Sequence, residues 1–238
     1  MIRNVLFLII LLGSSSMAFS QENEEAETID PSKPTNLYTQ VNVDAELNSY
    51  KAYETYGSRF NFQYAPNPDN LILGEIPVLY NPETKKMGFS DMRIRYFNVR
   101  RLQGSTLMAI APFTDIYMPT GNESHGLGGG TWSLSVGLIA GLVFSNSVSV
   151  FPGLSYVYLT KLKQNGALFQ TNISLKFNDS LYAFFNPNVL VISNKTTWQS
   201  DSSLNYIVKP NLFKVKVGWS PNFTDESNTY NIGGTFYF

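Results

Sequence analysis

Residues 132–144 read Trp-Ser-Leu-Ser-Val-Gly-Leu-Ile-Ala-Gly-Leu-Val-Phe, and no other part of the chain alternates more clearly. Every second residue from Trp132 to Phe144 is apolar, whereas the residues between them begin as Ser133, Ser135 and Gly137. Because successive side chains of a β-strand point to opposite faces, this stretch predicts a strand with one continuous apolar face. Aromatic side chains end that face on both sides, which is typical of strands that cross a membrane in a closed barrel.

Comparable segments recur along the rest of the chain. Their lengths suit the ~9–11 residues that a tilted membrane strand needs. In a soluble β-sandwich the apolar face points inward, so alternation alone leaves both folds open. The segment lengths and the aromatic ends favour the barrel. We expect strands at residues 36–46, 57–65, 70–80, 89–99, 105–118, 131–145, 147–160, 167–178, 180–193, 197–208, 211–222 and 229–238.

The composition agrees with a membrane protein that has no helical spans. Charged residues make up 15% of the chain and aromatic residues 14%, whereas soluble domains carry about 25% charged residues. After Gln21 no stretch approaches the ~18 uninterrupted apolar residues of a membrane helix. In lipid, only a closed barrel then pairs every backbone N–H and C=O group. The sequence therefore predicts an all-β fold, a monomeric, transmembrane antiparallel up-and-down β-barrel of about twelve strands.

The start of the chain resembles a secretory signal peptide at residues 1–20. Arg3 precedes an apolar run, and Ala18 and Ser20 form a small-x-small cleavage site before Gln21. The alternative, a permanent helical anchor, needs about 20 apolar residues. Residues 21–34 are acidic and contain two prolines, so we expect a disordered periplasmic tail, with a docking role as the alternative. The barrel is expected at residues 35–238.

The last eight residues, Asn-Ile-Gly-Gly-Thr-Phe-Tyr-Phe, bear on the compartment. Asn231, Gly233, Phe236 and Phe238 resemble the signal that the outer-membrane assembly machinery reads on a final strand. A terminal aromatic ring suits the membrane interface. The alternative is an ordinary strand that ends in Phe by chance. With the signal peptide, this pattern predicts the outer membrane as the location, with its lipid and its assembly machinery as partners.

Connection lengths predict the orientation. If the barrel begins in the periplasm, its odd-numbered connections are external and long, and its even-numbered ones periplasmic and short. The short even connections include Asn146, Asp179 and residues 209–210. An even strand count also returns the C-terminus to the periplasm. Among the odd connections, only the one at residues 194–196 is short and breaks this order. The odd connections are expected at residues 47–56, 81–88, 119–130, 161–166, 194–196 and 222–228.

Two stretches resemble a bacterial outer-membrane family named for the meta-cleavage pathway of phenol degradation. Gly88-Phe-Ser-Asp-Met-Arg-Ile-Arg-Tyr96 is similar to its Gly-Leu-Gly-Asp … Arg-Tyr strand. Met118-Pro-Thr-Gly121, followed by Gly126-Leu-Gly-Gly-Gly-Thr-Trp132, is similar to its Leu-Pro-Thr-Gly and Gly-Leu-Gly-x-Gly pair. The resemblance covers roughly residues 59–158, with Phe89 and Met118 in place of Leu. It implies passage of small hydrophobic or aromatic compounds across the outer membrane.

Charged residues within the expected strands are candidates for the lumen wall. Arg93 and Arg95 alternate with apolar residues, and an Arg on the lipid side costs about 2–4 kcal/mol at mid-bilayer, so both must face inward. By the same argument Glu75 on the third expected strand and Asp115 on the fifth face inward. We hypothesise a cross-strand charge ladder of these four residues that lines a pore. The alternative is that the charges only neutralise each other and plug the interior. Further polar lumen residues are expected at Lys214, Lys216, Lys176, Gln170 and Asn172.

Chemistry on this chain is restricted by what the sequence contains. With no Cys, disulfides and Cys-based sites are excluded, and the balance of 17 basic against 18 acidic residues does not suggest a nucleic-acid partner. The single His125 directly follows Ser124, and adjacent side chains of an extended chain face apart, which disfavours a catalytic pair. Residues 126–130 precede a strand and no helix, so they are expected to be a mobile external loop without phosphate binding. We expect no catalytic residue, metal or cofactor.

The leading functional hypothesis is a barrel that passes or binds small molecules, hydrophobic or aromatic ones among them. The first alternative is a structural or surface-binding barrel with a plugged lumen. The second is a barrel enzyme that acts on lipid, because some twelve-stranded outer-membrane barrels are phospholipases. The sequence does not name the solute.

Overall fold

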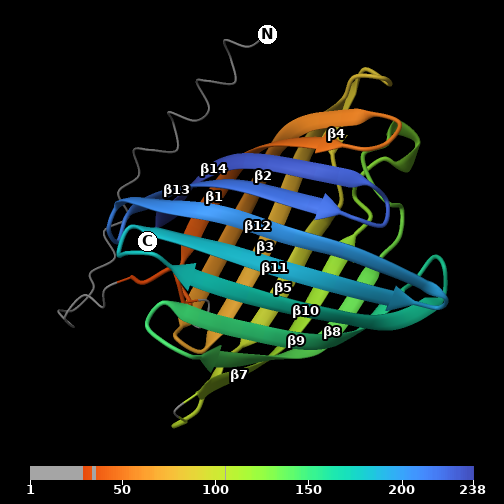
Figure 1. The fold of residues 1–238 in the computed structure, drawn as a ribbon. Helices are drawn as coiled ribbons and strands as arrows, with labels where there is room; N and C mark the ends of the chain where they lie inside the picture. Colours follow the sequence, from red (N-terminus) through yellow and green to blue (C-terminus); the bar gives the residue numbers. More distant parts are fainter. Residues whose placement is uncertain (1–28, 34–35, 105) are drawn as a thin grey trace.

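The computed structural model describes residues 29–33, 36–104 and 106–238. Its strands form one antiparallel sheet closed into a barrel (Figure 1). Closure comes from the pairing of the first strand with the last. The strands are β1 (Gln40–Ser49), β2 (Glu54–Asn67), β3 (Asn70–Asn81), β4 (Lys86–Phe89), β5 (Met92–Asn98), β6 (Arg100–Arg101), β7 (Leu107–Met118), β8 (Ser133–Val143), β9 (Val148–Leu159), β10 (Gln164–Lys176), β11 (Leu181–Ile192), β12 (Lys195–Lys209), β13 (Phe213–Asn222) and β14 (Ser227–Tyr237).

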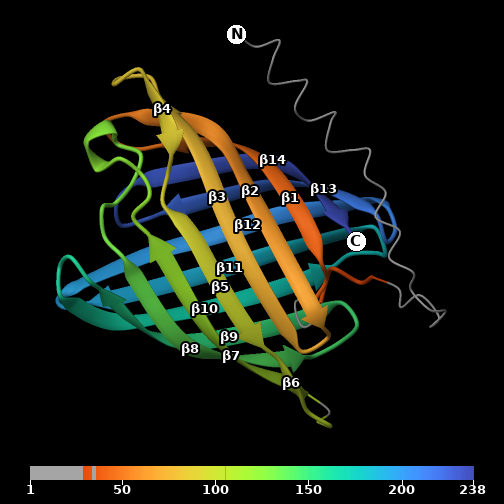
Figure 2. The same cartoon turned by 180° about the vertical axis from the view of Figure 1, so that it is seen from behind.

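Three of these strands, β4, β5 and β6, are short and are successive parts of one strand of the barrel wall. β3 pairs with β4 near one end and with β5 near the other, and β5 and β6 both pair with β7. Figure 2 shows β4 and β6 at opposite ends of this composite strand. The barrel therefore has twelve wall strands, each of which overlaps one segment expected from the sequence. The predicted fold class is confirmed. No helix in the described ranges is long and apolar enough to cross a membrane.

The outer face of the barrel is apolar. Leu134, Val136 and Leu138 on β8 are all exposed, Val136 to 56% of its surface, as the alternation of residues 132–144 predicts. Tyr230 and Ile232 continue this face on β14. Large aromatic side chains are exposed around the whole wall, including Tyr56, Phe62, Tyr64, Tyr96, Trp132, Phe144, Tyr156, Phe169, Phe177, Trp198, Tyr206, Trp219, Phe236 and Phe238.

The interior is largely polar. Asn42, Asp44 and Glu46 alternate along β1 and are all at most 6% exposed, whereas Val43 between them is exposed. A soluble sandwich buries its apolar face, so this inside-out arrangement excludes that alternative and leaves the membrane barrel. Other buried polar residues on the inner wall are Asn61, Asp115, Ser155, Ser174, Asn188, Asn205 and Thr235.

Both the first described residues and the C-terminal residue lie at the same end of the barrel, which we call the terminal mouth (Figure 1). The opposite end, the loop mouth, carries the odd-numbered connections. All of these except residues 194–196 were predicted to be long. That prediction is confirmed for residues 119–132 and wrong for the other four, where only residues 50–53, 82–85, 160–163 and 223–226 lie outside strands. The strands at these connections are joined by tight turns, in which Lys85, Lys163, Ser193 and Glu226 adopt positive φ values.

The described part of the N-terminal segment, residues 29–33, contacts the barrel. Ser32 is only 4% exposed, and its carbonyl oxygen accepts a hydrogen bond from the Ser174 hydroxyl. Asp30 lies 3.7 Å from the ammonium of Lys176, and the Ile29 N–H donates to Asn211. Residues 29–33 are therefore placed at the barrel rim by Asp30 and Ser32. The disordered tail expected at residues 21–34 stays a prediction. The signal peptide at residues 1–20, residues 21–28 and residue 34 lie outside the described part of the chain.

Candidate functional site: the barrel lumen

The four residues predicted as a charge ladder meet on the inner wall. Glu75 stands opposite Arg93 in the β3–β5 register, and Arg95 stands opposite Asp115 in the β5–β7 register. The Arg93 guanidinium donates to Asp115 at 2.7 Å and to Glu75 at 3.3 Å. The Arg95 Nε also donates to Asp115, at 2.9 Å. Asp115 is thus held by two arginines at once.

The ladder extends onto β1 and β2, where no lumen residue was predicted, and reaches the predicted lumen residue Lys216. Arg59 on β2 lies 3.6 Å from Glu75 and 2.8 Å from Glu46 of β1. On the other side of the closure, Lys216 of β13 lies 2.9 Å from Asp44 of β1. We call the whole set the ionic belt: Asp44, Glu46, Arg59, Glu75, Arg93, Arg95, Asp115 and Lys216. Asp44 and Glu46 alternate with apolar residues just as Arg93 and Arg95 do, so the same signal would have found them.

A glycine makes room for the last ion pair of the belt. Lys216 and Asp44 both stand opposite Gly233, which lies on β14 between their strands. A Cβ atom at residue 233 would lie 1.9 Å from Asp44 Oδ1. Only glycine therefore lets the two side chains meet across β14. Gly233 therefore has a packing role. That the outer-membrane assembly machinery recognises it stays a prediction. Of the other signal residues, Asn231 faces the lumen, and Phe236 and Phe238 face outward.

Lys214 also faces the lumen but does not join the belt. Its side chain is buried, and its ammonium donates to the Tyr182 hydroxyl at 2.9 Å. The ammonium also lies 6.0 Å from the ring centre of Tyr237. Within the described ranges no carboxylate lies at salt-bridge distance from Lys214. The two lysines predicted together thus have different surroundings.

Two polar chambers occupy the lumen. The loop-side chamber, of ≈ 430 Å³, is lined by most of the belt together with Asp201 and Ser220. The terminal-side chamber, of ≈ 400 Å³, is lined by Lys214 and by Pro31 and Lys33 of the N-terminal segment. The chambers meet at a shared set of lining residues: Asn61, Glu75, Asn172, Phe184, Ser203 and Lys216.

The long connection at the loop mouth is anchored. The Asp91 carboxylate accepts hydrogen bonds from the backbone N–H groups of Gly121 at 3.1 Å and Gly129 at 2.7 Å. A Cβ atom at residue 128 would lie 2.5 Å from Asp91 Oδ1, so glycine is needed at this close approach. Leu127 is 2% exposed. The loop that was predicted to be mobile is therefore attached to the barrel wall through Asp91. The sequence analysis placed Asp91 within a strand and so did not predict these contacts.

Ser124 and His125 each have hydrogen-bond partners elsewhere, and none joins their side chains in the described residues. Both belong to the short 3₁₀ helix η2 (Glu123–His125). The Ser124 hydroxyl donates to Asn122 at 2.7 Å, and the His125 carbonyl accepts from Asn81 at 2.9 Å. In the described part of the chain, no group of three His, Cys, Asp or Glu side chains is placed to hold a metal ion.

Comparison with known proteins identifies the fold. No protein-family model and no curated protein sequence matches the chain, so the resemblance to the phenol meta-pathway family is not confirmed. Among solved structures the chain is similar to the NanC porin, with a TM-score of 0.66 and 10% identity over 83% of this chain and 100% of that one. The KdgM porin gives 0.61 and 11% identity over 83% and 99%.

An outer membrane channel from Pseudomonas putida F1 gives a TM-score of 0.61 and 8% identity over 92% of this chain and 100% of that one. At such low identity these likenesses concern the backbone path alone. Together with the closed antiparallel sheet, they show that the chain has the fold of the outer-membrane porin-like β-barrels.

Proposed function

We propose that this protein is an outer-membrane channel that passes small molecules through its lumen. The observation that carries the proposal is the pair of polar chambers that meet at the ionic belt, inside a wall whose outer face is apolar. In a membrane β-barrel of this kind, the apolar outer face contacts lipid and the polar interior can hold water. The C-terminal pattern and the porin-like fold support the outer membrane as its location, with both termini in the periplasm.

The charge balance of the belt indicates which solutes suit it. Four carboxylates face four cationic side chains, and each carboxylate lies within salt-bridge distance of a cation. Rings of one sign of charge select ions in channels. The ionic belt has equal numbers of positive and negative side chains, so it does not form such a ring. It presents positive and negative groups close together to a passing solute. We therefore expect small neutral or dipolar solutes, with weak ion selectivity.

Removing one cation from the belt tests this proposal. In Arg93→Ala, Glu75 keeps only Arg59 and Asp115 keeps only Arg95, so the lumen gains a net negative charge. We expect the reversal potential in a KCl gradient to shift toward cation selectivity, and the conductance to rise. Single channels in planar bilayers provide the measurement.

The matched control is Lys195→Ala, which removes an exposed cation paired with Asp225 at the loop mouth. It should shift the reversal potential much less than Arg93→Ala does. Wild-type conductance and selectivity in Arg93→Ala would contradict a pore-lining role for the belt.

A plugged structural or surface-binding barrel is the second candidate. It is favoured by Pro31 and Lys33, which line the terminal-side chamber, and by Ser32 between them, whose carbonyl oxygen accepts a hydrogen bond from Ser174. Such a barrel would insert into bilayers without passing solutes. The proposal includes no lipid hydrolysis by Ser124 and His125, because the Ser124 hydroxyl donates to Asn122 and no hydrogen bond joins it to His125 in the described ranges. Hydrolysis of phospholipid by the purified protein, lost in His125→Ala, would contradict that part.

A further inference from the structure

The terminal-side chamber differs from the ionic belt in its charge balance. Among the described residues, its lining contains four cationic side chains and one carboxylate, that of Glu75. The loop-side chamber instead has four carboxylates against three cations. An excess of cationic groups in a confined space raises the local concentration of anions. The cations of the terminal-side chamber are Lys33, Arg95, Lys214 and Lys216.

Three of these four cations already have a carboxylate partner. The Arg95 Nε donates to Asp115 at 2.9 Å, and the Lys216 ammonium lies 2.9 Å from Asp44. The Lys33 ammonium lies 4.0 Å from the Asp30 carboxylate. In the described ranges, Lys214 is the one cation of the four without a carboxylate at salt-bridge distance. The charge excess of the chamber is therefore centred on Lys214.

Lys214 is held in an aromatic part of the wall. It is 8% exposed, and it lines the terminal-side chamber, so its exposed part faces that space. Its ammonium donates to the Tyr182 hydroxyl at 2.9 Å and lies 5.5 Å and 6.0 Å from the ring centres of Tyr182 and Tyr237. An ammonium has three N–H donors, so two remain without an acceptor among the described residues. Two rings and one hydroxyl compensate a buried ammonium only in part, because an unpaired charge is costly to bury.

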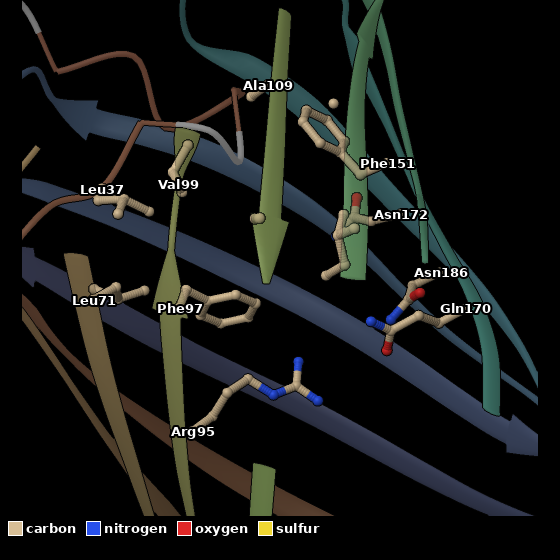
Figure 3. A pocket seen from close by; sticks show the side chains of 13 residues that line it. Leu37, Leu71, Arg95, Phe97, Val99, Ala109, Phe151, Gln170, Asn172 and Asn186 are labelled. Carbon is tan, nitrogen blue, oxygen red and sulfur yellow. The ribbon is translucent and has the colours of Figure 1, made fainter. Parts of the chain in front are cut away.

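The missing partner of Lys214 is defined by charge and hydrogen bonding. It carries one negative charge, because a second charge would meet cations that are already paired. It accepts two hydrogen bonds, and the two oxygens of a carboxylate suit the two free N–H groups. Elsewhere in the chamber wall Leu37, Leu71 and Phe97 lie together, which leaves an apolar surface for a short aliphatic chain (Figure 3).

We propose that Lys214 binds a single carboxylate group in the terminal-side chamber. For a solute, this site selects small aliphatic monocarboxylates. The proposal deepens the channel function, since it adds one charged class to the neutral and dipolar solutes that the belt suits. It rests on the channel function only for the route by which a solute arrives.

Binding of butyrate to the full barrel in detergent tests the site, with butyramide as the matched neutral probe. The two probes are nearly equal in size and differ in charge. Saturation-transfer NMR in a chloride-free buffer reports both, and an empty-micelle sample gives the background. We expect wild-type protein to bind butyrate about tenfold more tightly than butyramide, because hydrogen bonds from a charged donor to a charged acceptor are the stronger ones.

Substitutions of lysines locate the binding. Lys214→Met removes the charge at similar side-chain length and should weaken butyrate binding about tenfold. Lys214→Arg keeps the charge and should keep the binding. Lys209→Met is the matched control, since Lys209 is an exposed lysine at the end of β12, and should also keep it. Lys214→Gln replaces Lys214→Met if circular dichroism shows that the latter has lost its strands.

The carboxylate has two sources, a solute and the chain itself. The N–H of Ile29 donates to Asn211 at the terminal mouth, and four glutamates precede it in the sequence. A quadruple variant separates the sources, and it combines Glu22→Gln, Glu24→Gln, Glu25→Gln and Glu27→Gln. Butyrate binding by the wild type supports a solute site. Lys214-dependent binding that appears only in the quadruple variant supports the same site with the chain's own glutamates as its occupants.

The absence of Lys214-dependent butyrate binding in both the wild-type and the quadruple background would overturn the proposal. Equal affinities for butyrate and butyramide would overturn it as well, and so would displacement of butyrate by an equal concentration of chloride. Liposome permeability to sugars is measured on the same preparations. Permeable liposomes without Lys214-dependent binding leave the channel function standing, and such binding with impermeable liposomes leaves the carboxylate site standing.

Discussion

At the scale of single residues, the structure of the lumen wall depends on buried charged side chains. Asp115 has a side chain only 4% exposed and accepts hydrogen bonds from Arg93 and Arg95. Gly233 shows the complementary effect, in which the absence of a side chain allows an ion pair to form. Both residues stand in the sequence as members of simple alternating patterns. Their energetic roles come from neighbours on other strands.

Asp115→Asn should destabilise the barrel. It removes the carboxylate that two buried arginines share, and breaking such a buried pair costs about 3–5 kcal/mol. Asp225→Asn removes the acid of an exposed pair and should cost about 0–1 kcal/mol. Urea unfolding from lipid vesicles gives both free energies of unfolding. Equal unfolding midpoints for the two variants would show that the belt is not a stabilising network.

Gly233→Ala should also destabilise the barrel, by about 1–3 kcal/mol, because the new methyl group overlaps Asp44 and separates it from Lys216. Gly74→Ala is the matched control, since a Cβ atom there has no neighbour within 4 Å. The fraction of barrel folded into vesicles at increasing urea measures both. A Gly233→Ala barrel as stable as the Gly74→Ala barrel would remove the packing explanation for Gly233.

At the scale of elements, local patterns predicted the strands well and their ends poorly. Alternation is a property of neighbouring residues, so every wall strand was found, yet the first was expected at residues 36–46 and lies at Gln40–Ser49. Turn residues resemble polar strand residues, which is why the hairpin loops are shorter than expected. The composite strand β4–β5–β6 is interrupted at residues 90–91, where Asp91 binds the loop backbone.

Asp91→Ala should release the loop of residues 119–132. The change leaves the N–H groups of Gly121 and Gly129 without their acceptor, so the loop opens more often. A Glu-specific protease should then cut at Glu123 faster than in wild type. Asp179→Ala changes a fully exposed acid at the other mouth and should leave that rate unchanged. An unchanged cutting rate in Asp91→Ala would contradict the anchoring role.

At the scale of the whole molecule, the lumen required the closed barrel before it could be described. Glu75, Arg93, Arg95 and Asp115 were predicted together because their strands are consecutive in sequence. The Lys216–Asp44 pair was not, because β13 and β1 become near neighbours only through closure. An apolar pocket of ≈ 160 Å³ in the inner wall draws on side chains from several strands and on Leu37, and no local pattern contains that combination.

Liposome swelling tests the central claim most directly. Vesicles that contain the refolded full chain are diluted into iso-osmotic solutions of small neutral sugars, and light scattering reports solute entry. A channel whose two chambers connect through the belt should produce swelling that slows as the sugar becomes larger. Swelling no faster than in protein-free vesicles, with the barrel shown to be folded, would contradict the account and establish a plugged lumen.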